Sequence, residues 1–198
     1  MIKFENLNIE EPYHFFKTKY DEALKANQKA LEAMTISSFN KEKDEVDSRY
    51  VNLKFLINDE FIFFSNYNSP KAVAFNSHNQ IVALIYWASI NVQIRIKAKI
   101  KRTSNEFNKE YFFNRSKEKN ALAISSKQSE IIMSYKEVIK NYEITQKKAD
   151  LTVCPEYWGG FSFTPYYFEF WEGHESRINK RLVYKKIDTK WEKSIIQP

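Results

Sequence analysis

The clearest pattern of hydrophobic and polar positions lies in residues 91–103, NVQIRIKAKIKRT. From Val92 to Ile100 every second residue is apolar, and the residues between them are Gln93, Arg95 and lysines. Side chains of a β-strand point alternately to its two faces, so the pattern predicts a long strand with one buried face and one basic face. The basic face is interpreted first as a solvated outer surface, with an anion groove or a nucleic-acid track as alternatives.

Shorter apolar segments, separated by turn residues, predict the remaining strands. A tight turn at Asn58-Asp59 joins two of them, and the region from about residue 156 to 198 is expected to consist of strands. The expected strands cover residues 33–39, 49–57, 60–66, 80–88, 160–164, 166–172 and 181–187.

Apolar residues at helical spacing predict the helices. The first covers about residues 13–31, beginning near Glu11, with Pro12 in its first turn. A short helix over residues 69–76 has Ser69 as its expected N-cap. Two more cover residues 105–114 and 128–148. Many strands and a few helices, without regular βαβ alternation, predict a mostly β protein: an antiparallel barrel with peripheral helices.

The composition supports one folded domain over residues 1–198. The chain is 43% hydrophobic and 16% aromatic, which is enough apolar surface for a substantial core. The longest apolar run, Ile81–Ala88, is too short to cross a bilayer, and the N-terminus lacks the apolar core of a signal peptide. We therefore expect a cytoplasmic protein that does not contact a membrane.

The inventory of rare residues excludes several kinds of site. Cys154 is the only cysteine and the three histidines are scattered, so no metal site is expected. The chain has only three glycines, Gly159, Gly160 and Gly173, and their spacing fits neither a P-loop nor a Rossmann phosphate-binding loop. A bound phosphate would therefore have to be held by side chains, which a net charge of +6 permits.

Cations placed among apolar residues are the candidate binding groups. Lys54 is expected on the face of its strand opposite Leu53, and Arg177 and Arg181 follow the aromatic pair Phe170-Trp171. A charge beside such residues needs an anionic partner, and a phosphate would serve.

Eight short blocks together resemble the pyridoxamine/pyridoxine 5'-phosphate oxidase family. Any single block is weak evidence, but their order and spacing match from about Pro12 to Pro198. The blocks are RYVNLK (49–54), FFSNYNSPKA (63–72), Gln93, YFFNR (111–115), KQS (127–129), WGGF (158–161), EFWEG (169–173) and RINKR (177–181).

The resemblance implies an FMN-binding split β-barrel that forms a homodimer, with FMN at the subunit interface. It also implies oxidation of a phosphorylated B6 vitamer, pyridoxamine or pyridoxine 5'-phosphate, to pyridoxal 5'-phosphate. A hydride passes to flavin N5, and O2 reoxidises the flavin to give H2O2. In this family pattern Arg177, over the pyridine ring, and Asn179 take the catalytic positions.

The resemblance also assigns the binding residues. Arg49 and Lys71 are matched to the FMN phosphate, and the substrate phosphate is matched to side chains that include Lys54. The cofactor set is Arg49, Lys54, Phe64, Ser65, Lys71, Gln93, Gln128, Ser129, Trp171 and Arg181; the substrate set is Lys54, Tyr111, Arg115, Lys119 and Arg177.

Four features depart from the family pattern. Pro70 replaces an arginine and removes one charged contact to FMN, and Lys119 replaces a serine of the substrate-phosphate site. Asn179 replaces a histidine, and an amide cannot carry a proton near neutral pH. The chain starts close to its first helix, so no N-terminal arm over the substrate is expected. Two alternatives therefore stay open: a family flavoprotein with a different redox substrate, or a non-catalytic binder of flavin or pyridoxal phosphate. Nucleic acid is the least favoured ligand.

Overall fold

A computed structural model describes residues 1–198. The strand expected over residues 91–103 is β7, which pairs with β8 over its whole length and with β6 from Val92 to Lys99. In chain order the elements are β1 (Lys3–Glu5), α1 (Glu11–Lys25), β2 (Ala33–Asn40), β3 (Glu45–Asn52), β4 (Phe55–Ile57), β5 (Glu60–Asn66), α2 (Pro70–Ser77), β6 (Gln80–Trp87), a 3₁₀ turn (Ala88–Ile90), β7 (Val92–Arg102), α3 (Asn105–Asn114), α4 (Lys117–Ser125), α5 (Tyr135–Lys148), β8 (Trp158–Glu172), β9 (Lys180–Ile187) and β10 (Lys190–Ile196).

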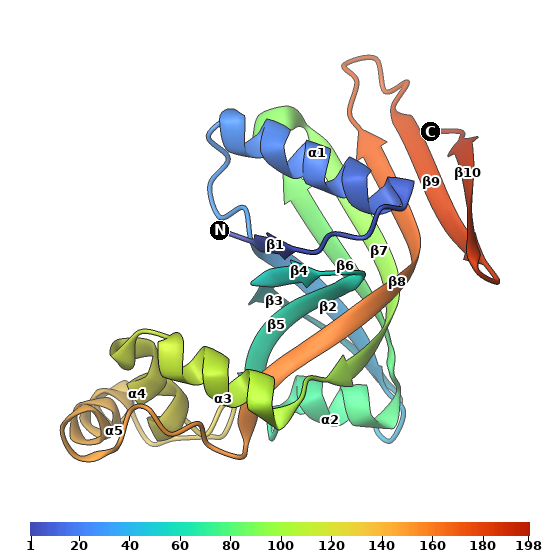
Figure 1. The fold of residues 1–198 in the computed structure, drawn as a ribbon. Coiled ribbons are helices and arrows are strands. Elements are labelled where there is room, and N and C mark those ends of the chain that lie inside the picture. Colours follow the sequence, from blue (N-terminus) through green and yellow to red (C-terminus); the bar gives the residue numbers. More distant parts are fainter.

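The strands form one curled sheet in the order β1-β4-β5-β8-β7-β6-β2-β3, and β9 joins β8 to β10 (Figure 1). Every pairing is antiparallel except the short one between β1 and β4. The first part of β8 pairs with β5 and its last part pairs with β9. The two ends of β8 therefore have different neighbouring strands, β5 at its start and β9 at its end.

Aromatic rings fill the inside of the barrel. Phe61 stacks on Phe163 across β5 and β8, with ring centroids 5.2 Å apart. Helix α1 closes one end (Figure 1), and its Tyr13 and Phe16 are fully buried against Phe61. Thirty of the buried apolar residues form one cluster, which is the core of the barrel.

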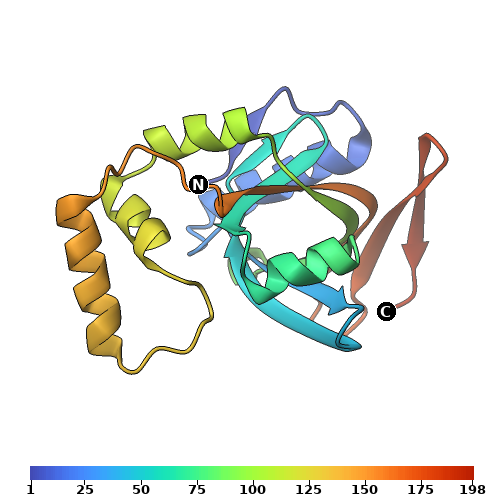
Figure 2. The ribbon, with the colours of Figure 1, turned by 90° about the horizontal axis from the view of Figure 1, so that it is seen from below.

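Helices α3, α4 and α5 form an arm that projects from the other end of the barrel (Figure 1). Seen from below, the loop between α4 and α5 runs back toward the barrel (Figure 2). The buried Asn120 amide anchors the arm, because its Nδ2 donates to the Phe112 carbonyl at 2.8 Å and to the Leu151 carbonyl at 2.9 Å. None of the helices is long and apolar enough to cross a membrane.

Several predicted boundaries were wrong. The first helix ends at Lys25 rather than residue 31, and Asn27 and Ala30 in the turns that follow have positive φ of 56° and 50°. The single strand expected over 49–57 is two strands, β3 and β4, separated at residues 53–54. The helix expected over 128–148 begins only at Tyr135, where the Ser134 hydroxyl caps it.

The two strands expected at 160–164 and 166–172 are one strand, β8. Pro165 lies inside it, although proline cannot donate to a strand ladder. The register with β7 shifts at this point, so that Pro165 faces Ala98 while Tyr167 faces Lys97. This bulge accommodates the proline without ending the strand.

Candidate functional site

A buried lysine defines the centre of the candidate site. Lys71, in the first turn of α2, is only 7% exposed. Its Nζ donates to Ser65 Oγ at 3.0 Å and to Ser69 Oγ at 3.2 Å, and it has no carboxylate within ion-pair distance. Burial, helped by the charge of Arg49, lowers the pKa of Lys71 to about 8. The structure therefore holds a buried cation whose direct partners are neutral hydroxyls.

Ser69 takes the expected N-cap position of α2 but does not cap the helix. Its hydroxyl donates to the Asn66 carbonyl at 2.7 Å and accepts from Lys71. The predicted capping bond is therefore replaced by a bond to the buried lysine.

Arg49, on strand β3, is close enough to Lys71 for its charge to lower the pKa of the lysine. Its Nη1 donates to Ser38 Oγ at 2.8 Å and to the Ile36 carbonyl at 3.3 Å, and its Nη2 bonds to Asp47. These three acceptors fix the position of the guanidinium, and the side chain is 18% exposed. The site therefore contains two cations, Arg49 and Lys71, that lie close to each other.

Next to these cations lies a cavity of about 240 Å³ with an aromatic wall. Phe64 stacks on Tyr111 with centroids 3.8 Å apart, and on Trp158 at 5.2 Å. Gly160 makes room for this wall, since an added Cβ would lie 3.2 Å from the Phe64 ring and 2.5 Å from Thr103 Oγ1. Seven predicted residues line the cavity: Lys54, Phe64, Ser65, Lys71, Tyr111, Arg115 and Gln128.

A second group of cations borders the same aromatic wall. The Arg115 guanidinium lies 5.0 Å from the Trp158 ring centre and donates to the Lys119 carbonyl at 2.9 Å. Burial lowers the pKa of Lys54; Glu32, 3.9 Å away, opposes this, while the charges of Lys119 and Arg115 add to it. Lys119 lines an adjacent cavity of about 240 Å³ that Phe64, Ser65 and Arg115 also line.

The loop between α4 and α5 adds Gln128 to the first cavity. Its Oε1 accepts from Ser65 Oγ at 3.3 Å and from the Asn66 amide at 3.4 Å. Ser129, the next residue, is exposed and has a positive φ of 71°. It lines a different cavity, on the side of the loop that faces α5.

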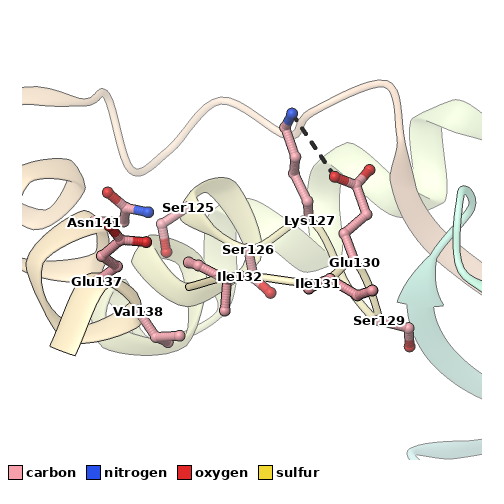
Figure 3. Close-up of a pocket in the computed structure, with 10 residues that line it drawn as sticks. All are labelled: Ser125, Ser126, Lys127, Ser129, Glu130, Ile131, Ile132, Glu137, Val138 and Asn141. Carbon is pink, nitrogen blue, oxygen red and sulfur yellow. Dashed lines mark ion pairs between the residues drawn. The ribbon is translucent and has the colours of Figure 1, made fainter. Parts of the chain in front are cut away.

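A larger cavity, about 440 Å³, lies between this loop and α5 (Figure 3). Its charged lining residues are Glu137 and the ion pair Lys127–Glu130 at 3.8 Å, and Ser129 is the only predicted residue on its wall. The cations of the chain gather elsewhere, so we place the site at the smaller cavity beside Lys71.

The remaining predicted residues lie at the opposite end of β8. Gln93 faces Trp171, and Trp171 faces Arg181, across β7, β8 and β9. Arg177 and Asn179 belong to the exposed turn before β9, where Arg177 has a φ of 61° and Asn179 Oδ1 accepts from the His174 amide at 3.0 Å. One chain therefore does not bring these residues to the cavity beside Lys71.

The basic face of β7 is largely paired within the chain. Arg95 bonds to the buried Glu169, and Lys101 pairs with Glu60. Lys97 lies 4.9 Å from the Tyr167 ring centre. These pairings agree with the interpretation as an outer surface and do not support a nucleic-acid track. No group of three or more His, Cys, Asp or Glu side chains is placed to hold a metal ion.

Four residues that contact the predicted cations were not predicted as site residues from the sequence. They are Asp47, Ser69, Trp158 and Glu169. Asp47 precedes Arg49 by two positions, which places both on one face of a strand. Glu169 lies between buried aromatic residues, and a carboxylate in such a position signals a buried ion pair. Both signals were present in the sequence.

The curled antiparallel sheet with its peripheral arm defines a split β-barrel. PhzG from Burkholderia lata 383, solved with tetrahydrophenazine-1-carboxylic acid, has this fold: the TM-score is 0.90 at 21% identity, over 95% of this chain and 93% of that one. A pyridoxamine 5'-phosphate oxidase-related, FMN-binding protein of Nostoc punctiforme matches with a TM-score of 0.79 at 11% identity, over 96% of this chain and 99% of that one.

Sequence comparison identifies the family. The chain is 30% identical, over 95% of its length and 89% of the relative's, to a pyridoxine/pyridoxamine 5'-phosphate oxidase of Leptospira interrogans. Residues 158–198 match the family model for the pyridoxine 5'-phosphate oxidase C-terminal dimerisation region. The chain belongs to the pyridoxine/pyridoxamine 5'-phosphate oxidase family. The predictions of this family and of the split-barrel fold are confirmed.

Proposed function

We propose that this protein is an FMN-dependent oxidase that converts pyridoxamine or pyridoxine 5'-phosphate to pyridoxal 5'-phosphate. The observation that carries the proposal is Lys71, a buried cation with only hydroxyl partners beside a second cation, Arg49. Burying an uncompensated charge is costly, whereas a phosphate dianion would compensate both cations. Lys71 and Arg49 are both charged hydrogen-bond donors, so the residues present fit the FMN phosphate.

The two cation groups suit two phosphates. Arg49 and Lys71 would hold the phosphate of FMN. The other parts of the cofactor would contact Ser65, Gln128 and Ser129. Each charged hydrogen bond to a phosphate contributes about 1.5–3 kcal/mol. Bound FMN supplies the acceptor for the substrate's C4' hydride and passes its electrons to O2, giving H2O2. The substrate phosphate would be held by the second group: Lys54, Tyr111, Arg115 and Lys119.

The second half of each site would come from a partner subunit. Gln93, Trp171 and Arg181 lie at the far end of β8 from Lys71, so they would contact FMN across a homodimer interface. The match of residues 158–198 to a dimerisation region supports this arrangement, because that region contains both Trp171 and Arg181. Arg177, from the same region, would cover the pyridine ring, with Asn179 next to it.

A second candidate is a family flavoprotein that acts on a different redox substrate. Asn179 favours it, because its side chain is engaged with the His174 amide and cannot act as a proton carrier. Lys119 favours it too, since it adds a cation to the substrate side of the cavity.

An absorbance spectrum of the purified protein, taken before and after anaerobic addition of each vitamer phosphate, tests the proposal. We expect a flavin spectrum that bleaches with pyridoxamine or pyridoxine 5'-phosphate, and O2 uptake with H2O2 release on aeration. Bound flavin that neither ester reduces, but that another amine, alcohol or nicotinamide donor reduces, would establish the second candidate. A flavin that no donor reduces would indicate a non-catalytic binder. A protein that binds no FMN would overturn all of these.

A further inference from the structure

An acidic side chain is bonded to one of the two cations of the site. Asp47 lies two residues before Arg49 on β3, and its carboxylate bonds to the Arg49 guanidinium through Nη2. The acid is 61% exposed, while the arginine is 18% exposed. Asp47 is therefore the more solvent-exposed member of the pair, and its carboxylate occupies the Nη2 donor of Arg49.

The same carboxylate also acts on the buried lysine. Burial raises the pKa of Asp47, but the hydrogen bond from Arg49 and the charges of Arg49 and Lys71 outweigh this and hold it below its ordinary value. In turn, Asp47 partly offsets the lowering of the Lys71 pKa. Asp47 is thus bonded to one cation of the proposed phosphate site, Arg49, and its charge also acts on the other, Lys71.

We propose that Asp47 is an internal counter-ion of this site, which a phosphoryl group must displace from Arg49, so that it sets the affinity for phosphorylated flavin. The inference rests on the proposed function, because it takes FMN as the phosphorylated ligand. Arg49 offers its Nη2 to either oxyanion, and its Nη1 is already committed to Ser38 and Ile36. A carboxylate that remained nearby would also repel the incoming dianion.

The charge at position 47 therefore opposes binding of FMN but not of riboflavin, which lacks the phosphate. Asp47→Asn keeps the size of the side chain and its capacity to accept a hydrogen bond. We expect this variant to bind FMN about tenfold more tightly, since removing one charge from the vicinity of a dianion is worth on the order of one power of ten. Riboflavin affinity should stay unchanged.

The test is a titration of flavin-free protein with FMN and, separately, with riboflavin, followed by quenching of flavin fluorescence. Asp44→Asn is the matched control: Asp44 lies in the turn of the same hairpin, is exposed and has a φ of 52°, which asparagine tolerates. It removes the same charge without touching Arg49, so we expect no change. Asp47→Ser serves as a second variant, and a thermal unfolding curve shows that each variant is folded.

The outcomes separate the two proposals. Tighter FMN binding in both Asp47 variants, with riboflavin and the control unchanged, supports the counter-ion. Weaker or unchanged FMN binding in Asp47→Asn overturns it, and weaker binding would mean that Asp47 holds Arg49 in place for the ligand. An equal effect on riboflavin also overturns it. If the wild type and every variant fail to bind FMN, the proposed function fails together with the inference.

Discussion

The Oε1 atom of Glu169 lies 2.9 Å from Nε and 2.7 Å from Nη2 of Arg181. Glu169 is only 3% exposed, and it also accepts from Arg95 and from the Tyr167 hydroxyl. Burial acts to raise the pKa of Glu169, but the hydrogen bonds from Arg181, Tyr167 and Arg95 outweigh it and hold the pKa low. The ionised carboxylate therefore links β7, β8 and β9 and fixes the direction of Arg181.

Glu169→Ala should consequently weaken both folding and FMN binding. We expect the free energy of unfolding to fall by about 1–3 kcal/mol, because Arg95 and Arg181 lose a shared partner while keeping part of their solvent contact. FMN affinity should fall about tenfold if Arg181 contacts the cofactor. Urea unfolding and a fluorescence titration measure the two effects.

Two further variants isolate the role of the carboxylate. Glu169→Gln should recover part of the FMN affinity, since the amide oxygen still accepts from Arg181. Glu172→Gln, which removes a more exposed carboxylate from the same strand, should leave the affinity unchanged. Normal FMN affinity in Glu169→Ala would contradict the positioning role.

Lys71→Met should separate ligand binding from stability. The variant removes a buried charge that has no carboxylate partner, so we expect the flavin-free protein to unfold at the same or a higher urea concentration. FMN affinity should fall by about ten- to a hundredfold while riboflavin affinity stays constant. Lys99→Met, which removes an exposed cation from β7, is the control and should change neither. A loss of stability together with unchanged FMN affinity would show that Lys71 has only a structural role.

The pH dependence of FMN binding should follow Lys71. Because its pKa in the flavin-free protein is about 8, the lysine loses its charge above that pH and FMN affinity should decline. Below about pH 6 the phosphate takes up its second proton, so affinity should also decline there. Stability should change the other way: the unfolded chain binds more protons than the folded one between the two lysine pKa values, so the flavin-free protein should gain stability as pH rises above 8. Titrations and urea unfolding at several pH values check both, and Lys71→Met should lack both alkaline changes.

Sequence periodicity predicted the elements whose own residues decide their structure. The alternation in 91–103 predicted β7 within one or two residues, and the segment 105–114 is α3 as expected. The predicted boundaries were wrong where contacts between residues distant in the sequence determine the structure. Two strands were expected over 160–164 and 166–172, yet a bulge opposite Ala98 keeps β8 continuous through Pro165. No local pattern contains that register, because it depends on pairing with β7.

The candidate site was predictable as a set of residues but not as an arrangement. The family resemblance named Arg49 and Lys71, and the structure places them together. The spacing of Asp47 and Arg49 placed them on one face of a strand but did not determine that they bond, because either side chain could have turned to solvent. The separation of Arg181 from Lys71 also follows only from the paths of β8 and β9.

Lys119 should act on the substrate and not on the cofactor or the fold. It is exposed on α4, its Nζ has no hydrogen bond or ion pair, and it lines a cavity together with Arg115. Lys119→Ala should therefore leave the free energy of unfolding within about 0.5 kcal/mol of the wild type and FMN affinity unchanged. If its charge holds the substrate phosphate equally in the ground and transition states, KM for the vitamer phosphate should rise about tenfold at constant kcat. Steady-state oxidase kinetics measure this, with Lys117→Ala on the same helix as the control. An equal rise in KM for both variants would assign the effect to the general charge of the helical arm and not to Lys119.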